Sequence, residues 1–276
     1  MFKIKKSIIS KKALAVGNLA LVMVVFIVFH QLKIQTENNY VVVRQPVFEN
    51  PFKDIILEAK SAYVFDLIRQ EPLFELNSHT QLPLASITKI MMAIVAEEKL
   101  PETELEALSD IFKAALVSSS NNAAQAIATR TEDFMNNESF LEAMNIKAKE
   151  LKLNQTYFLN ETGLDVSDIV GGAYGSAVDI VSLISYAAKT SPSLFEITTK
   201  EEIGDFKNTN ITVGSTTQII LSKTGFTDLA NGNLAVIFDA GFGHPVAVVV
   251  LSSSKEGRFT DVDKLINATF KYLIKQ

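Results

Sequence analysis

The chain has 276 residues, of which 47% are hydrophobic and 21% are charged, a composition typical of globular rather than disordered proteins. Its formal net charge of −5 gives no reason to expect a nucleic-acid partner. The sequence contains no cysteine, which excludes disulfides, thiolate metal sites and a cysteine nucleophile.

The N-terminus has the pattern of a membrane anchor. Residues 1–12 form a basic segment with five lysines, followed by an apolar segment at 13–32 that carries no charge over 13–29. A helix over that run would span about 25 Å, close to a bilayer core of about 30 Å. The lysines predict a cytoplasmic N-terminus and an extracytoplasmic remainder, in a single-pass protein of the cell membrane. A cleaved signal peptide is the alternative, but no small-x-small cleavage site follows the apolar run.

Residues 33–52 are polar, contain two prolines and are predicted to be a linker, so that the folded domain spans 53–276. Hydrophobic periodicity in this domain predicts a β-hairpin, several helices, three strands and a closing helix, in that order. The strands are expected at 61–68, 72–76, 216–225, 233–241 and 245–254, and the helices at 86–98, 110–118, 123–130, 140–151, 177–189 and 258–274. This order predicts an α/β fold of the α+β kind, with an antiparallel sheet flanked by helices plus a helical lobe.

The sequence SITK at 86–89 places a serine and a lysine three residues apart at the start of an apolar helix. Ser86 and Lys89 would share one face of that helix, with their Cβ atoms about 5–6 Å apart. The following IMMAIVA is apolar nearly all round, so we expect a buried helix in which desolvation lowers the pKa of Lys89. A neutral amine beside a hydroxyl is a general base for a serine nucleophile. The plainer interpretation is a surface lysine that extends from a helix start.

Two further motifs gain meaning only together with the first. In SSSNN at 118–122, Ser119 and Asn121 lie between two predicted helices, where they could equally form a helix cap. KTG at 223–225 follows an apolar strand. Lys223 and Thr224 could bind an anion there, and Gly225 would leave room for the backbone of a ligand.

In the order SxxK, SxN and KTG, the motifs resemble the signature of active-site serine penicillin-binding proteins and β-lactamases. Over residues 55–276 the chain resembles the low-molecular-mass D-alanyl-D-alanine carboxypeptidases, serine peptidases of the penicillin-binding type. The stretches NIKAKELKLNQTYFLNETGLD and GSAVDIVSLISYAAK carry the resemblance further, as does Arg258 in EGRFTDVDKL. It implies a β-lactamase/DD-peptidase-like catalytic domain at 53–276. It also favours Ser119 among the serines at 118–120, because NNAA then follows as in that family.

The resemblance implies a mechanism for the catalytic residues. Ser86 would attack the carbonyl between two D-alanines and form an acyl-enzyme, with Lys89 taking its proton. Ser119 would relay a proton to the leaving amine, and Asn121 would hold the substrate amide. The reaction would remove the terminal D-alanine of peptidoglycan stem peptides, and endopeptidase action on cross-links would use the same chemistry. β-Lactam antibiotics would be covalent inhibitors.

The resemblance also implies how the substrate is held. Lys223 would support the proton network, and Thr224 and Arg258 would bind the terminal carboxylate. The N–H groups of Ser86 and Phe226 would form the oxyanion hole. No cofactor is implied. No two of the histidines at 30, 79 and 244 share metal-ligand spacing, so no metal is expected.

Two other functions remain open at this point. A class A β-lactamase uses a glutamate in an ExxLN loop, and ELKLN offers Glu150 and Asn154, although Glu150 also continues an amphipathic helix. A non-catalytic penicillin-fold protein that binds peptidoglycan is favoured by the short segment between Lys89 and Ser119. Relatives in the carboxypeptidase family carry an extra hairpin and helix there, so we expect one wall of the cleft to be incomplete.

Overall fold

The computed structural model describes residues 11–37, 49–215 and 217–274. The chain divides into two units, with helix α1 (Lys11–Glu37) in the first and the second beginning at Glu49. Within the described residues, no helix combines the length and the apolar character needed to cross a membrane. The predicted membrane-spanning helix at 13–32 is therefore not supported. Most of the predicted basic segment at 1–12 and of the linker at 33–52 lies outside the described residues.

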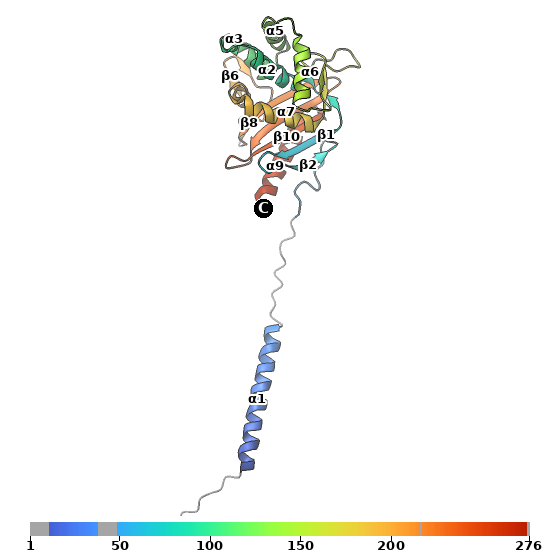
Figure 1. Cartoon of the computed structure of the whole chain (residues 1–276). Coiled ribbons are helices and arrows are strands. Elements are labelled where there is room, and N and C mark those ends of the chain that lie inside the picture. The colour runs from blue at the N-terminus through green and yellow to red at the C-terminus, as the bar shows by residue number, and fades with distance from the viewer. Residues whose placement is uncertain (1–10, 38–48, 216, 275–276) are drawn as a thin grey trace, which may run out of the picture. The chain divides into compact units, whose positions relative to one another are not determined.

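The second unit is built on one antiparallel sheet with the strand order β2-β1-β10-β9-β8. Its strands are β1 (Ser61–Asp66), β2 (Glu71–Leu76), β8 (Ile219–Thr227), β9 (Asn231–Asp239) and β10 (Pro245–Ser253). The N-terminal hairpin thus pairs with the last strand of the chain, so that segments far apart in sequence lie side by side (Figure 1). The predicted hairpin, three strands and antiparallel sheet are confirmed.

Both faces of this sheet are covered, which makes its central strands apolar on both sides. On β10, Val248 and Val250 face a core shared with α9 (Gly257–Ile274), whereas Ala247 and Val249 face a second core shared with α7 (Ala177–Thr190). This is the two-residue alternation that a strand imposes on its side chains. The result is a three-layer arrangement of α7, sheet and α9.

Five helices form the predicted lobe next to α7, at one end of the domain in Figure 1. They are α2 (Thr88–Lys99), α3 (Glu102–Ala107), α4 (Ser109–Leu116), α5 (Asn121–Glu132) and α6 (Phe140–Glu150). The helix α2 is the centre of the lobe, because every side chain from residue 88 to 96 is buried. The sequence predicted this burial from the apolar run on all sides of the helix.

Several short elements were not predicted. Strands β3 (Leu82–Pro83), β4 (Tyr157–Phe158) and β5 (Ala173–Gly175) form a small sheet in the order β3-β5-β4. A second hairpin consists of β6 (Glu202–Ile203) and β7 (Phe206–Lys207), after helix α8 (Pro192–Glu196) and the 3₁₀ turn η2 (Ile197–Thr199). Strands of two or three residues carry no readable periodicity, yet the small sheet fixes the entry to α2 through a 2.9 Å hydrogen bond from the Leu84 N–H to the Ala173 carbonyl.

Candidate active site

Ser86 lies on η1 (Ala85–Ile87), a single 3₁₀ turn between β3 and α2. Ala85 has a positive φ of 48°, which an alanine rarely adopts, and its carbonyl accepts a 2.7 Å hydrogen bond from the Thr88 hydroxyl. The amide of Asn233 on β9 donates to the Pro83 carbonyl at 3.0 Å. The backbone before Ser86 is therefore anchored both to the helix that follows and to the main sheet.

The strand β8 approaches the backbone around Ser86 so closely that Gly225 has no room for a side chain. A Cβ atom on Gly225 would lie 2.8 Å from the Leu84 carbonyl oxygen and 3.2 Å from the Ser86 amide nitrogen. Gly163 makes a similar close approach to the Ala85 carbonyl, with a φ of 77°. The close approach of Gly225 therefore brings the KTG motif into contact with the start of the SITK motif.

The amine of Lys89 contacts three other groups of the site. Its Nζ lies 2.8 Å from the Ser86 Oγ, 2.7 Å from the Asn121 Oδ1 and 3.0 Å from the Thr162 carbonyl oxygen. The side chain is fully buried, and burial lowers the pKa of Lys89 to about 7, although the negative charge of Glu161 acts in the opposite direction. Lys89 thus has access to its neutral form near neutral pH.

The serines at 118–120 have three different environments. Ser120 is the N-cap of α5, because its side chain accepts a hydrogen bond from the Ala123 N–H. The Ser118 hydroxyl donates to the Lys207 carbonyl at 3.1 Å. Ser119 has a positive φ of 60°, and its Oγ accepts a 2.9 Å hydrogen bond from Lys223. Among the three, Ser119 is the one whose hydroxyl forms a hydrogen bond with a residue of the KTG motif.

Lys223 is the second buried lysine of the site. Its Nζ donates to the Ser119 Oγ at 2.9 Å and to the Thr224 carbonyl at 3.1 Å. Burial lowers its pKa well below the ordinary value for lysine, and the positive charges of Lys89 and Arg258 lower it further. Two lysines with lowered pKa values therefore flank Ser86 and Ser119.

Arg258, at the start of α9, places a buried guanidinium behind β8. Its Nη1 donates to the Gly225 carbonyl at 2.7 Å, and its Cζ lies 4.7 Å from the centroid of the Phe259 ring. The Nε of Arg258 is buried without a hydrogen-bond partner among the described residues. An unpaired buried N–H is costly, so this atom is a candidate donor to an anionic ligand. Phe226 is 42% exposed, with the Lys255 Nζ 5.4 Å from its ring.

The loop after β4 supplies partners that the motifs do not reveal. The Asn160 side chain accepts hydrogen bonds from the N–H groups of Thr162 and Gly163, which fixes the turn that aims the Thr162 carbonyl at Lys89. Asp165 then accepts a 2.9 Å hydrogen bond from the Thr227 hydroxyl at the end of β8. The sequence shows an Asn-x-Thr-Gly turn, but nothing in it indicates that this turn contacts Lys89.

The short connection between Lys89 and Ser119 was expected to leave a wall of the cleft incomplete. Near Ser119, the end of β7 and the residues that follow it, which we call the hairpin segment, lie against this connection. The Thr209 N–H donates to the Val117 carbonyl at 3.1 Å, and the Ser118 hydroxyl donates to Lys207. Thr209 also meets the KTG motif, with 2.6 Å between its Oγ1 and that of Thr224. The hairpin segment therefore borders the candidate site where the connection is short.

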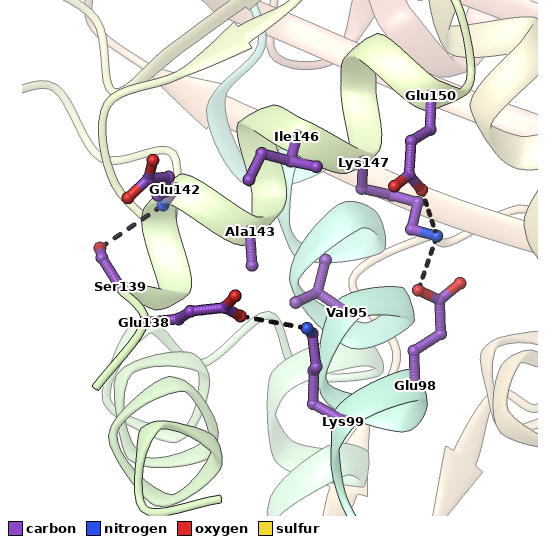
Figure 2. Close-up of a pocket in the computed structure, with 10 residues that line it drawn as sticks. All are labelled: Val95, Glu98, Lys99, Glu138, Ser139, Glu142, Ala143, Ile146, Lys147 and Glu150. Atoms are coloured by element: carbon purple, nitrogen blue, oxygen red, sulfur yellow. Dashed lines mark hydrogen bonds and ion pairs between the residues drawn. The ribbon is translucent and has the colours of Figure 1, made fainter. Parts of the chain in front are cut away.

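Glu150 belongs to a different part of the surface. It lines a groove of about 240 Å³ between α2 and α6 and forms a 2.8 Å ion pair with Lys147. Figure 2 shows the side chains of this groove. Lys147 also pairs with Glu98, and Lys99 pairs with Glu138. The two lysines thus pair with three of the four glutamates of this groove. Glu150, the carboxylate that a class A β-lactamase would need beside its serine, is one of the three.

The chain matches the family model for the D-alanyl-D-alanine carboxypeptidases over residues 101–255. It is 30% identical to a D-alanyl-D-alanine endopeptidase of Pseudomonas aeruginosa, over 76% of this chain and 76% of that protein. It is 27% identical to the D-alanyl-D-alanine carboxypeptidase DacF of Bacillus subtilis, over 77% of this chain and 62% of that protein.

Solved structures show the same similarity. Penicillin-binding protein D2 of Listeria monocytogenes, in its ampicillin-bound form, is 28% identical and superimposes with a TM-score of 0.68. The match covers 79% of this chain and 99% of that one. The mixed α/β fold of the second unit is thus the fold of penicillin-binding DD-peptidases, as the motifs predicted.

Proposed function

The chain belongs to the D-alanyl-D-alanine carboxypeptidase family of serine peptidases, and on this premise we propose that it removes the terminal D-alanine of peptidoglycan stem peptides through an acyl-enzyme on Ser86. The contacts of Lys89 are the observation that carries this proposal. Its Nζ reaches the Ser86 hydroxyl from a fully buried position and with a pKa near neutrality.

The three oxygen contacts of Lys89 can be made by an ammonium or by a neutral amine, and the proposed mechanism uses the neutral form. A neutral amine has two N–H donors and one lone pair, whereas an ammonium has three donors and no acceptor. The Asn121 Oδ1 and the Thr162 carbonyl oxygen at Lys89 can only accept hydrogen bonds. They take both N–H groups, which leaves the lone pair for the proton of the Ser86 hydroxyl. In this form Lys89 is the general base for attack on the substrate carbonyl.

Breakdown of the tetrahedral intermediate requires a proton for the leaving amine. Ser119 and Lys223 supply it in the proposal, because their side chains are joined by a 2.9 Å hydrogen bond and the lysine exchanges protons readily at its lowered pKa. Arg258 and Thr224 bind the terminal carboxylate, with the unpaired Nε of Arg258 as one donor. The amides of Ser86 and Phe226 act as the oxyanion hole.

Endopeptidase action on peptide cross-links is the second candidate. The Pseudomonas relative at 30% identity is an endopeptidase, and the Bacillus relative at 27% identity is a carboxypeptidase. The two activities differ in whether the leaving group is free D-alanine or a second stem peptide. Incubation with a monomeric pentapeptide and with a cross-linked dimer, followed by mass spectrometry of the products, separates them. Release of D-alanine from the monomer supports carboxypeptidase action, and cleavage of the dimer alone supports the endopeptidase.

Intact mass after incubation with benzylpenicillin tests the nucleophile. We expect one stable adduct on the wild type and on Ser167→Ala, a matched control on an exposed turn, and none on Ser86→Ala. A folded wild type that neither forms an adduct nor consumes penicillin would favour the non-catalytic function. Rapid turnover of the penicillin, with no lasting adduct, would favour the β-lactamase.

The proposed substrate also suggests where the domain works. Peptidoglycan is assembled outside the cytoplasmic membrane, so we propose an extracytoplasmic location for the domain. Protease treatment of intact spheroplasts is the test. Degradation of the domain from outside supports this location, and full protection contradicts it.

A further inference from the structure

We propose that Thr209 is a positioning residue that fixes the hydroxyl of Thr224 for binding the terminal carboxylate of the substrate. The observation is the 2.6 Å distance between the two Oγ1 atoms, which is the one hydrogen bond of the Thr224 hydroxyl within the described residues. The inference rests on the proposed function, because that function assigns Thr224 to the carboxylate. The motifs SxxK, SxN and KTG do not include Thr209.

Either hydroxyl of this pair can donate in the free protein, and a bound carboxylate selects the direction. Its hydroxyl has one proton and two oxygen partners, the Thr224 Oγ1 at 2.6 Å and the Val117 carbonyl at 3.4 Å. The shorter contact is the stronger one, since O–H···O bonds are normally about 2.7–2.8 Å long. The Val117 carbonyl already accepts the Thr209 N–H at 3.1 Å, so it stays paired when the hydroxyl turns away. Thr209 can therefore donate to Thr224, and it must do so once the Thr224 proton goes to a carboxylate.

With its acceptor side occupied in this way, the Thr224 hydroxyl presents its proton to a ligand. Thr224 is only 3% exposed, so water cannot readily replace the donor that Thr209 provides. A chain of two hydroxyls also polarises the second one, which strengthens its hydrogen bond to an anion. A carboxylate accepts hydrogen bonds and donates none, so it needs Thr224 as a donor.

Thr209 is itself held rigidly by the residues on either side. The Asn208 amide donates to the carbonyls of Thr198 and Lys200 at 3.0 and 2.8 Å, and its Oδ1 accepts the Asn210 N–H at 2.8 Å. Together with the bond from the Thr209 N–H to Val117, these contacts fix the backbone of Thr209 on both sides. A positioning group must be preorganised in this manner to act without reordering when the ligand binds.

The test compares two substitutions with two acylating agents. Thr209→Val keeps the shape of the side chain and removes the hydroxyl, whereas Thr209→Ser keeps the hydroxyl. Benzylpenicillin carries a carboxylate, and p-nitrophenyl acetate does not. Thr190→Val, at an exposed threonine that ends α7, is the matched control for the substitution, and Ser86→Ala gives the background at other nucleophiles. Rates of adduct formation on Ser86 are measured by intact mass.

We expect Thr209→Val to lower the rate constant for acylation by benzylpenicillin roughly tenfold, and Thr209→Ser and Thr190→Val to change it by less than about twofold. With p-nitrophenyl acetate, all variants should match the wild type. An equal loss with both agents would show a general distortion of the site and overturn the inference. A Thr209→Val protein that reacts with benzylpenicillin at the wild-type rate would overturn it as well, as would a Thr209→Ser protein that is as slow as the valine variant.

Failure of the proposed function gives a different result. If the wild type is acylated by benzylpenicillin but releases no D-alanine and cleaves no cross-link, the peptidase proposal fails. In that case, the acylation rates of the Thr209 variants with benzylpenicillin still test the proposed role of Thr209. A wild type that releases D-alanine, with Thr209→Val equally fast on benzylpenicillin, overturns the inference alone. A folded wild type that reacts with neither agent overturns both.

Discussion

The Nζ of Lys89 lies 2.8 Å from the Oγ of Ser86, on a side chain with no exposed surface. Burial lowers the pKa of Lys89 to about 7, and below that pH the amine is protonated and cannot accept the serine proton. The acylation rate should therefore rise with pH through about 7 and level off above it. Rapid-quench measurements with benzylpenicillin between about pH 5 and pH 10 give this profile. A rate that is flat over the whole range would exclude Lys89 as the base.

Asn121→Asp should move this profile to higher pH. The Oδ1 of Asn121 accepts a 2.7 Å hydrogen bond from Lys89. Aspartate has nearly the same shape as asparagine, so the substitution places a carboxylate beside the amine and changes little else. An opposite charge at this distance raises the pKa of an amine by about 1–3 units, which lowers the rate at neutral pH. Asn122→Asp is the control, because this neighbour is exposed. Equal midpoints for the two variants would mean that Asn121 does not contact Lys89 in solution.

Glu161→Gln should move the same midpoint in the opposite direction. The negative charge of Glu161 favours the protonated form of Lys89, so its removal lowers the pKa of the amine. Since Glu161 is partly exposed and screened by water, we expect a shift of less than about one unit. Glu150→Gln, in the groove of Figure 2, removes the same charge from a carboxylate that pairs with Lys147 and does not act on Lys89, so it should leave the midpoint unchanged. A shift to higher pH in Glu161→Gln would contradict this assignment.

Gly225→Ala should impair acylation more than its effect on stability explains. The added Cβ would meet the Leu84 carbonyl at 2.8 Å and the Ser86 amide at 3.2 Å, so η1 must move away from β8. We expect a loss of about 1–3 kcal/mol in the free energy of unfolding and an acylation rate at least roughly tenfold lower. Gly204→Ala is the comparison, because it has a φ of 60° and open space around it. It should lose stability from backbone strain and keep the wild-type rate, and a similar loss of rate in both would contradict the prediction.

The long elements of the fold were predictable because each carries its own periodicity. The apolar run in α2 and the β-rich run in β10 are properties of single segments, and both elements were confirmed. The strands β3, β4 and β5 have no such signal, because two or three residues cannot show a period. Their pairing depends on contacts between segments that lie far apart in the chain.

Some contacts of the candidate site could be predicted from the sequence, and others could not. The approach of Ser86 to Lys89 follows from their spacing on one turn, and the resemblance to a known family indicated Ser119 and Lys223. Thr209 and the Thr162 carbonyl were missed, since a threonine in a loop and a backbone oxygen have no distinctive sequence pattern. The preference for free or cross-linked peptides is not encoded in the motifs, because both reactions use the same groups.

The pairing of β1 with β10 also governs how the protein must fold. Ser61 pairs with Leu251, and the two lie near opposite ends of the domain's sequence. The central sheet therefore cannot close until nearly the whole domain has been synthesised, and contacts of such long range slow folding because a large loop must be ordered first. The serine of η1 precedes the KTG strand by more than half of the domain. A nascent chain consequently carries its nucleophile long before it has a site in which that nucleophile could react.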